Sequence, residues 1–410
     1  MLGERDAGVD STKDDATVTT SQQLFPPEIA EVRDAVHEAA RGVTERYGRA
    51  YFIDCVKSHK FPEEMWSAMG EQGLLGLGVP EEYGGSGGGL VEVTAAMEAL
   101  SMAGVPMATF LLTTFARETI LRHGSEEQKA RFVAPTATGE TRMAFAITEP
   151  NAGTNSWRIE TTALRQDSGN FLLNGQKVFI SAADSSQHMM VVCRSTKLSE
   201  VEDRRAGMAI VVIDTNSPGI ELQPLDIAVE IADQQFAVFF TDVEVPAENL
   251  IGEADQAFRY MFDALNPERV LTASWGIGIG DYALEKAVAY SNDRAPFGKP
   301  IGSYQALQHP MARAKARLDA ARIMMYTAAR VFDDGGDAGY LANAAKLLGS
   351  EAGTEACDVA IQAHGGYAFD REFDVLTLWP LARVLRNIPI NNEMILNYIG
   401  EHVLGLPRSY

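Results

Sequence analysis

Cysteine is scarce in this sequence. Cys55, Cys193 and Cys357 are the only three among 410 residues, and no two of them have the spacing of a metal site or a redox pair. We therefore expect buried thiols in a reducing compartment, with a cytoplasmic location. The seven histidines form no HExxH or HxxxH pattern, so we expect no metal site.

Long hydrophobic runs are missing as well. No window holds 18 apolar residues, so we expect no membrane span. The first residues, MLGERDAGVDSTKDDATVTTSQQL, are rich in Asp and Thr and lack the apolar core of a signal peptide. This composition predicts a disordered tail over residues 1–24.

Positive charge is in deficit. Lys and Arg together number 35 against 56 Asp and Glu, which gives a formal net charge of −21. Such a chain is poorly suited to bind phosphate backbones or anionic lipid, so we expect no nucleic-acid partner. An anionic ligand would need a local cationic site that acts against the overall field.

Apolar residues are plentiful, at 46% of the chain, and their periodicity divides it into three regions. Residues 25–141 have a helical pattern, in which Ser125 and Gln128 predict a capping box. Residues 142–251 consist of short β-branched or aromatic segments, with a turn signal at NG (174–175). Residues 252–410 are helical again, beginning with a long helix that we expect to break near Pro267. The fold class is therefore α+β.

Glycines recur at GIGIG (276–280), within the long helical pattern. A nucleotide-binding loop is the alternative to a helix there, but the spacing is not G-x-G-x-x-G and no strand precedes it. Glycines on a helical pattern are typical of close helix packing, which is the interpretation we adopt.

Four further motifs occur in order along the chain: PEEYGG (80–85), AFAITEPNAGTNS (144–156), NGQKVFIS (174–181) and RAPFGKPIGSYQALQ (294–308). Together with the order of helices, sheet and helices, they resemble the acyl-CoA dehydrogenase family. The resemblance implies an N-terminal helical domain, a middle β-barrel or sandwich domain and a C-terminal helical bundle. It also implies FAD as cofactor, dehydrogenation of an acyl-CoA substrate, an electron-transfer flavoprotein as electron acceptor, and a homotetramer.

Two of these motifs resemble the segments that contact the flavin ring. The resemblance implies that Thr154 also approaches the thioester, and the family's usual Ser-Asp is Thr154-Asn155 here. An aromatic and a hydroxyl residue two positions apart should share one strand face, so Phe179 and Ser181 would both meet the ring. From the residues alone, Phe179 could equally be a core residue. The full set expected here is Phe145, Ile147, Thr148, Gly153, Thr154, Phe179 and Ser181.

The last motif, with QAHGG (362–366), resembles the part of the family that binds the adenine-diphosphate half of FAD. That flavin is held mainly by a neighbouring subunit, which is why the resemblance implies an oligomer. An arginine beside a pyrophosphate makes charge-assisted hydrogen bonds, although it could also be a solvated surface charge. The residues expected at this site are Arg294, Phe297, Gln305, Gln362, Gly365 and Gly366.

The catalytic base of most relatives is a carboxylate at the position of Pro389, in RNIPINNEM, and no acid occurs between Asp374 and Glu393. Other members carry the base on the first helix of the C-terminal domain, directly before an arginine. Here that position is Glu268, in Asn266-Pro267-Glu268-Arg269. The resemblance implies Glu268 as the catalytic base, with Arg269 and Asn266 as substrate-binding residues. The alternative is a glutamate that stabilises the start of a helix.

Proline also lacks the N–H that polarises the thioester carbonyl in relatives with an acid at this position. A neighbouring N–H, a ribityl hydroxyl of the flavin or a different chemistry would then be needed. Two other functions are therefore weighed: a flavin-dependent monooxygenase or oxidase of the same fold, and a non-catalytic partner subunit of a mixed dehydrogenase. The sequence does not indicate the acyl group.

Overall fold

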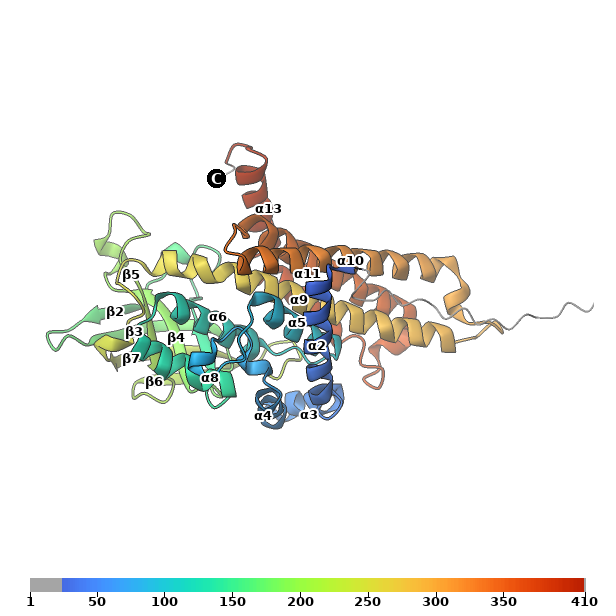
Figure 1. Cartoon of the computed structure of the whole chain (residues 1–410), viewed down its shortest axis with the longest axis horizontal. Coiled ribbons are helices and arrows are strands. Elements are labelled where there is room, and N and C mark those ends of the chain that lie inside the picture. The colour runs from blue at the N-terminus through green and yellow to red at the C-terminus, as the bar shows by residue number, and fades with distance from the viewer. Residues whose placement is uncertain (1–23, 409–410) are drawn as a thin grey trace, which may run out of the picture.

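A computed structural model describes residues 24–408, without the side chains of residues 262 and 263. The tail predicted over residues 1–24 lies outside this range, apart from Leu24. Helices come first, a curled sheet follows and helices return, as Figure 1 shows by colour from blue to red. The predicted α+β class, with helices at both ends of a middle sheet, is confirmed.

The N-terminal region is helical. Ser125 Oγ accepts a hydrogen bond from Gln128 N at 3.3 Å, and Gln128 Oε1 accepts one from Ser125 N at 2.9 Å, so the predicted capping box is confirmed. The Gln128 side chain also donates to two carbonyls beyond the sheet, Glu248 O and Leu250 O. The helices are α2 (Pro27–Thr44), α3 (Arg49–Ser58), α4 (Glu63–Glu71), α5 (Leu90–Met102), α6 (Ala108–His123), α7 (Glu126–Gln128) and α8 (Ala134–Thr138).

The middle region is a sheet in the order β1-β4-β2-β3-β7-β6, with β5 paired to β4. One face packs against α6 and the start of α9, and the other closes over a second apolar cluster. The turn predicted at Asn174-Gly175 is wrong. Strand β3 continues through it, and the pairing with β7 only shifts register between Leu173 and Gly175. The strands are β1 (Met143–Ala146), β2 (Thr162–Arg165), β3 (Phe171–Ser181), β4 (His188–Arg194), β5 (Met208–Asp214), β6 (Ile220–Leu225) and β7 (Gln235–Val245).

The C-terminal region is a bundle of long helices. The break predicted at Pro267 is wrong, because α9 runs uninterrupted through it. Helices α5, α6 and α11 pack along α9, which continues despite the lost N–H. The helices are α9 (Ala257–Asp293), α10 (Gln305–Asp333), α11 (Gly339–His364), α12 (Leu378–Arg383) and α13 (Asn392–Tyr398). In Figure 1, α13 and the segment after it project from the body.

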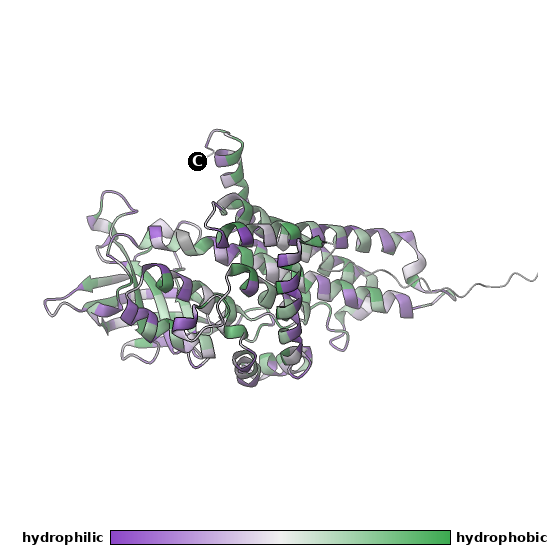
Figure 2. Ribbon diagram, viewed as in Figure 1, coloured by the Kyte–Doolittle hydropathy of each residue, from purple (hydrophilic) through white to green (hydrophobic). Residues whose placement is uncertain are grey.

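The glycines of GIGIG lie where α9 touches its neighbours. A Cβ on Gly278 would lie 2.5 Å from Ser101 Cβ of α5, and one on Gly276 would lie 2.9 Å from Gly349 O of α11. The prediction of close helix packing is therefore confirmed. In Figure 2, α2 and α10 carry many hydrophilic residues, while the strands of the sheet are largely hydrophobic.

The three cysteines are buried and unpaired, as expected. Within residues 24–408, no cluster of three or more His, Cys, Asp and Glu side chains could hold a metal ion. In that same range no helix combines the length and apolar character needed to cross a membrane.

Candidate active site

The segment after β1 is fastened to β3 by a buried ion pair. Lys177 Nζ donates to Glu149 Oε1 and to Ile147 O, both at 2.9 Å. Glu149 also accepts from Glu160 N at 2.7 Å and Thr161 N at 3.0 Å. Burial by itself would raise the pKa of Glu149, but Lys177 and these N–H donors lower it below its ordinary value. The ion pair thus holds the backbone of the predicted flavin segment in one place.

Strand β3 is irregular where it passes this segment. Its register with β7 shifts between Lys177 and Ile180, and Phe179 has a φ of 58°. From Phe179 to Ser181 the burial nevertheless alternates, with only Ile180 buried, so a strand face shared by Phe179 and Ser181 stays a prediction. Phe179 is 61% exposed, so it is not a core residue. The Ser181 hydroxyl accepts a hydrogen bond from Gln235 Nε2 at 2.7 Å.

Other predicted flavin residues lie beside these two. Phe145 is buried and packs edge-on against Phe115 of α6, with ring centroids 4.5 Å apart. Ile147 and Thr148 are half-buried, and Thr148 O accepts from the backbone of β3. A Cβ on Gly153 would meet nothing within 4 Å, so its backbone is open to a close-lying ligand.

The loop of residues 388–392 closes on this segment from the C-terminal region. Asn391 Nδ2 donates to Thr154 Oγ1 at 3.0 Å. Lys346 of α11 is buried, and its Nζ donates to Ile390 O at 2.5 Å and to Asn392 Oδ1 at 2.8 Å. The loop is therefore anchored to α11 on one side and to the predicted flavin segment on the other.

Glu268 lies in α9 with its carboxyl group buried, at 6% exposure. Burial raises its pKa from the ordinary 4.5 to about 7, although the nearby charges of Arg269 and Lys346 oppose the increase. A carboxyl group that exchanges its proton near neutrality is suited to act as a general base or acid. A glutamate that merely stabilises a helix start would lie in the first turn, whereas α9 begins at Ala257.

Arg269 and Asn266 lie one helical turn apart on α9. Arg269 Nη1 donates to Asn266 Oδ1 at 3.0 Å, so the two side chains form one unit. Arg269 Nε has no hydrogen-bond partner among the described residues and could donate to a polar ligand. An unpaired donor on a buried arginine is costly unless a ligand or water accepts from it.

The residues predicted to bind the adenine-diphosphate half of FAD lie elsewhere. Arg294 follows the C-terminal end of α9, which places it about 39 Å along the helix axis from Glu268. Its predicted partners are likewise exposed, and Phe297 has 84% of its surface accessible. The structure therefore does not bring these residues to Glu268 within one chain; they are Arg294, Phe297, Gln305, Gln362, Gly365 and Gly366.

Several residues at the site were not predicted. They are Glu149, Lys177, Lys346 and Asn391. A signal existed for Lys346, because it stands between Ala345 and Leu347 in an apolar segment, where a fully buried lysine needs a structural or chemical reason. Lys177 follows Gly175 and Gln176 and gave no such signal. No sequence signal joins Asn391 to Thr154, which lies 237 residues away.

A helical region, a curled sheet and a helical bundle, with a buried carboxyl group on the first helix of that bundle, define a class of three-domain flavin-dependent oxidoreductases. Family models match nearly the whole chain: "Acyl-CoA dehydrogenase, N-terminal domain" at residues 27–140, "middle domain" at 144–243 and "C-terminal domain" at 255–404. The chain belongs to the acyl-CoA dehydrogenase family, whose members use FAD.

Individual relatives agree with this assignment. The acyl-CoA dehydrogenase FadE12 of Mycobacterium tuberculosis is 38% identical over 384 residues, which cover 93% of this chain and 98% of that protein. The acryloyl-CoA reductase (NADH) of Anaerotignum propionicum is 32% identical, over 82% of this chain and 83% of that protein. The structure of butyryl-CoA dehydrogenase from Megasphaera elsdenii has a TM-score of 0.86 and 28% identity, over 91% of this chain and 98% of that one.

Proposed function

We propose that this protein catalyses the FAD-dependent α,β-dehydrogenation of an acyl-CoA thioester, with Glu268 as the base that removes the α-proton. The observation that carries the proposal is the buried Glu268 carboxyl group with a pKa of about 7. Most relatives carry the catalytic acid at the position of Pro389. Residues 375–392 of this chain contain no carboxylate that could take that role.

The chain's own residues divide the work as follows. Glu268 accepts the α-proton on a carboxylate oxygen, while the electron pair of that C–H bond forms the new double bond. Arg269 and Asn266 orient the substrate beside it, and Thr154 contacts the thioester. The chemistry that FAD supplies when bound is acceptance of the hydride from the β-carbon. The same groups support the reverse reaction, in which Glu268 returns the proton to the α-carbon.

Two separate groups of residues in this chain suit the two halves of an FAD molecule. Beside Glu268, the anchored segment with Phe145, Ile147, Thr148 and Gly153 borders an exposed aromatic ring, Phe179. An open aromatic face next to unobstructed glycine backbone suits a flavin ring and its phosphates. We propose that these residues, with Ser181 and Thr154, hold that half of the cofactor.

The distant residues around Arg294 support a proposal about assembly. An extended FAD molecule is shorter than the 39 Å or so that separates Arg294 from Glu268 along α9, so one flavin cannot touch both in one chain. Phe297 and Phe369 are exposed at this end, by 84% and 68%. We therefore propose a homotetramer in which Arg294, Phe297, Gln305, Gln362, Gly365 and Gly366 bind the adenine-diphosphate half of a neighbour's FAD.

The electron acceptor that we propose is an electron-transfer flavoprotein. A relative in Acetobacterium woodii, 30% identical over 360 residues, is named as a subunit of a caffeyl-CoA reductase–Etf complex. The same comparison favours a second candidate function, the reduction of an enoyl-CoA. The cytoplasmic location remains a prediction.

The test is anaerobic bleaching of the purified flavoprotein by straight, branched and cyclic acyl-CoA thioesters. We expect a subset to bleach the wild type, and Glu268→Gln to bind the same thioesters without bleaching. Bleaching that persists in the variant would show that Glu268 is not the base. Failure of every thioester with the wild type would instead favour the oxidase or monooxygenase reaction. A colourless protein that FAD cannot reconstitute would favour a non-catalytic subunit.

A further inference from the structure

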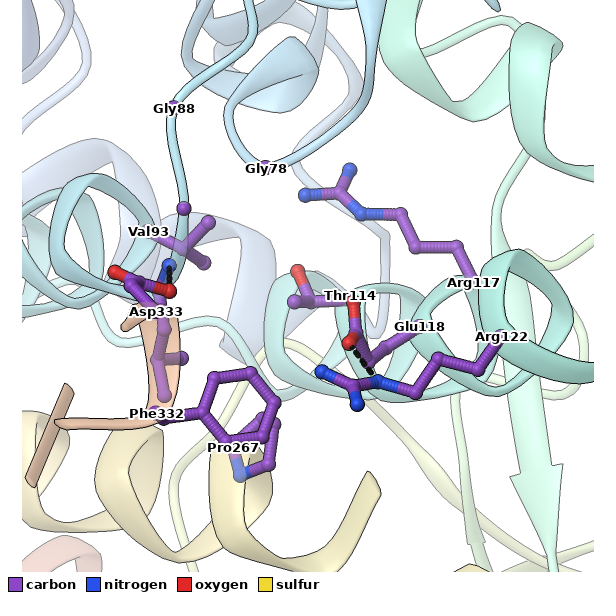
Figure 3. Close-up of a pocket in the computed structure, with 12 residues that line it drawn as sticks. Gly78, Gly88, Val93, Thr114, Arg117, Glu118, Arg122, Pro267, Phe332 and Asp333 are labelled. Atoms are coloured by element: carbon purple, nitrogen blue, oxygen red, sulfur yellow. Dashed lines mark hydrogen bonds and ion pairs between the residues drawn. The ribbon is translucent and has the colours of Figure 1, made fainter. Parts of the chain in front are cut away.

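A polar recess lies beside the segment of α9 that carries the proposed base. It has a volume of about 200 Å³ and lies between the loop of residues 78–89, α5, α6, α9 and the end of α10. Pro267, which directly precedes Glu268, is part of its wall, as Figure 3 shows. The volume corresponds to roughly six or seven water molecules, or to one small organic acid.

The charged groups of the recess differ in the partners that they already have. Glu118 accepts a hydrogen bond from Arg122 Nε at 2.5 Å, and the Arg122 guanidinium lies 4.7 Å from the centroid of the Phe332 ring. Asp333 accepts from the backbone N–H groups of Leu90 at 2.7 Å and Val91 at 3.0 Å, where it caps α5. Both acids of the recess therefore already have partners.

Arg117 is different. It is 2% exposed, and its guanidinium donates to backbone carbonyls, Leu75 O at 2.6 Å and Leu77 O. Within residues 24–408 it takes part in no ion pair. Burial lowers the pKa of Arg117 to about 10, and the charge of Glu118 offsets only part of the lost hydration. A buried guanidinium that makes direct contact only with carbonyl groups favours the binding of an anion.

Thr114 supplies the second observation. It lies one turn before Arg117 on α6, is 6% exposed, and its hydroxyl has no hydrogen-bond partner among the described residues. In Figure 3, Thr114 and Arg117 both extend from α6 toward the side of the recess where Gly78 lies. Other buried hydroxyls also lack partners, such as that of Thr94, but Thr94 does not line the recess.

We propose that this recess binds a small carboxylate, with Arg117 as its counterion and the Thr114 hydroxyl as a hydrogen-bond donor. Two sources share this chemistry: a free organic acid, or the distal carboxylate of an acyl group whose thioester lies at Glu268. Only the second source rests on the proposed function. The two can be separated, because binding of a free acid requires no turnover.

The first measurement is calorimetric titration of the holoenzyme with glutarate, and with glutaramide as the uncharged analogue. We expect glutarate to bind and glutaramide to fail. Thr114→Val keeps the shape of the side chain and removes only the hydroxyl, so it should leave folding intact while weakening glutarate binding about ten- to hundred-fold. Thr94→Val is the matched control, a buried hydroxyl of the neighbouring helix outside the recess, and should leave binding unchanged.

The second measurement compares glutaryl-CoA with pentanoyl-CoA, and adipyl-CoA with hexanoyl-CoA, in binding to the oxidised flavoprotein. A preference for the carboxylated thioester that Thr114→Val removes identifies the acyl group as the source. Binding of glutarate without such a preference identifies a free acid. Arg117→Met should abolish both, and Thr114→Val decides the matter if that variant does not fold. Absence of carboxylate binding, or binding that Thr114→Val leaves unchanged, overturns the proposal.

Discussion

Replacing Glu268 by Gln tests how burial sets the chemistry of this site. Glutamine has nearly the same shape but cannot accept a proton from carbon. A general base typically contributes about 10²–10⁴ to a rate, so we expect flavin reduction by a substrate to slow by at least about a hundred-fold. Substrate binding should persist, because Arg269 and Asn266 remain.

The wild-type pH profile follows from the same group. Proton abstraction needs the ionised carboxylate, and the pKa of Glu268 is about 7 in the folded protein. Reduction at limiting substrate should therefore rise about ten-fold per pH unit below pH 7 and level off above it. For an ordinary glutamate, with a pKa of 4.5, the rate of reduction would change little between about pH 5.5 and pH 8.

Stability should change with pH in the opposite direction. Since the pKa of Glu268 is higher in the folded state, the unfolded chain releases this proton first as the pH rises, and ionisation favours unfolding. The cost develops between pH 4.5 and about 7 and then stays constant. This difference between the folded and unfolded pKa corresponds to about 3 kcal/mol in the free energy of unfolding. For a chain of this length it corresponds to about 4 °C in Tm. Glu268→Gln lacks this cost, so its Tm relative to the wild type should increase by that amount from pH 4.5 to pH 8.

The assays are stopped-flow flavin reduction under anaerobic conditions and thermal unfolding, each at a series of pH values. A pH-independent rate between pH 5 and 8, combined with a constant Tm difference between variant and wild type, would refute the reasoning. It would mean that the carboxyl group is hydrated in solution and that burial does not control it.

Three further substitutions test the framework of the site. Gly353→Ala should lower stability by about 1–3 kcal/mol in thermal unfolding, because its Cβ would meet a backbone carbonyl of α9. Gly42→Ala, the control with open space around it, should raise stability slightly. Equal effects of the two substitutions would contradict the close packing of α11 against α9. Lys177→Met should leave its buried glutamate partner unpaired and reduce the FAD content of the purified protein; full FAD content would argue against an anchoring role. Lys346→Met removes a positive charge that lowers the pKa of Glu268, so the rising limb of the pH–rate profile should move to higher pH, and an unchanged limb would show that the two groups do not interact.

Local chemistry made much of the fold predictable. The capping box at Ser125 and Gln128 depends on two residues three positions apart, and the change to strands in residues 142–251 depends on short runs of β-branched and aromatic residues. The two local predictions that were wrong involve Pro267 and Asn174-Gly175. In each case contacts from distant elements, helices around α9 and strand β7 beside β3, override a local preference.

The site was predictable in its parts and not in its arrangement. Motifs indicated Thr154 and Glu268, because each stands in a short recognisable segment. Nothing local indicates that Asn391 forms a hydrogen bond with Thr154, or that Lys346 holds the loop of residues 388–392. Such contacts depend on how α11 and the loop of residues 388–392 pack against the sheet.

By itself, the sequence determined that helices precede and follow a sheet, that the flavin motifs are present, and that no acid stands between Asp374 and Glu393. It could not determine whether Glu268 is an ordinary surface glutamate or a base active near neutral pH. That was decided by the tertiary structure, since burial by residues far away along the chain raises the pKa of the carboxyl group despite the opposing charges of the neighbouring Arg269 and the distant Lys346.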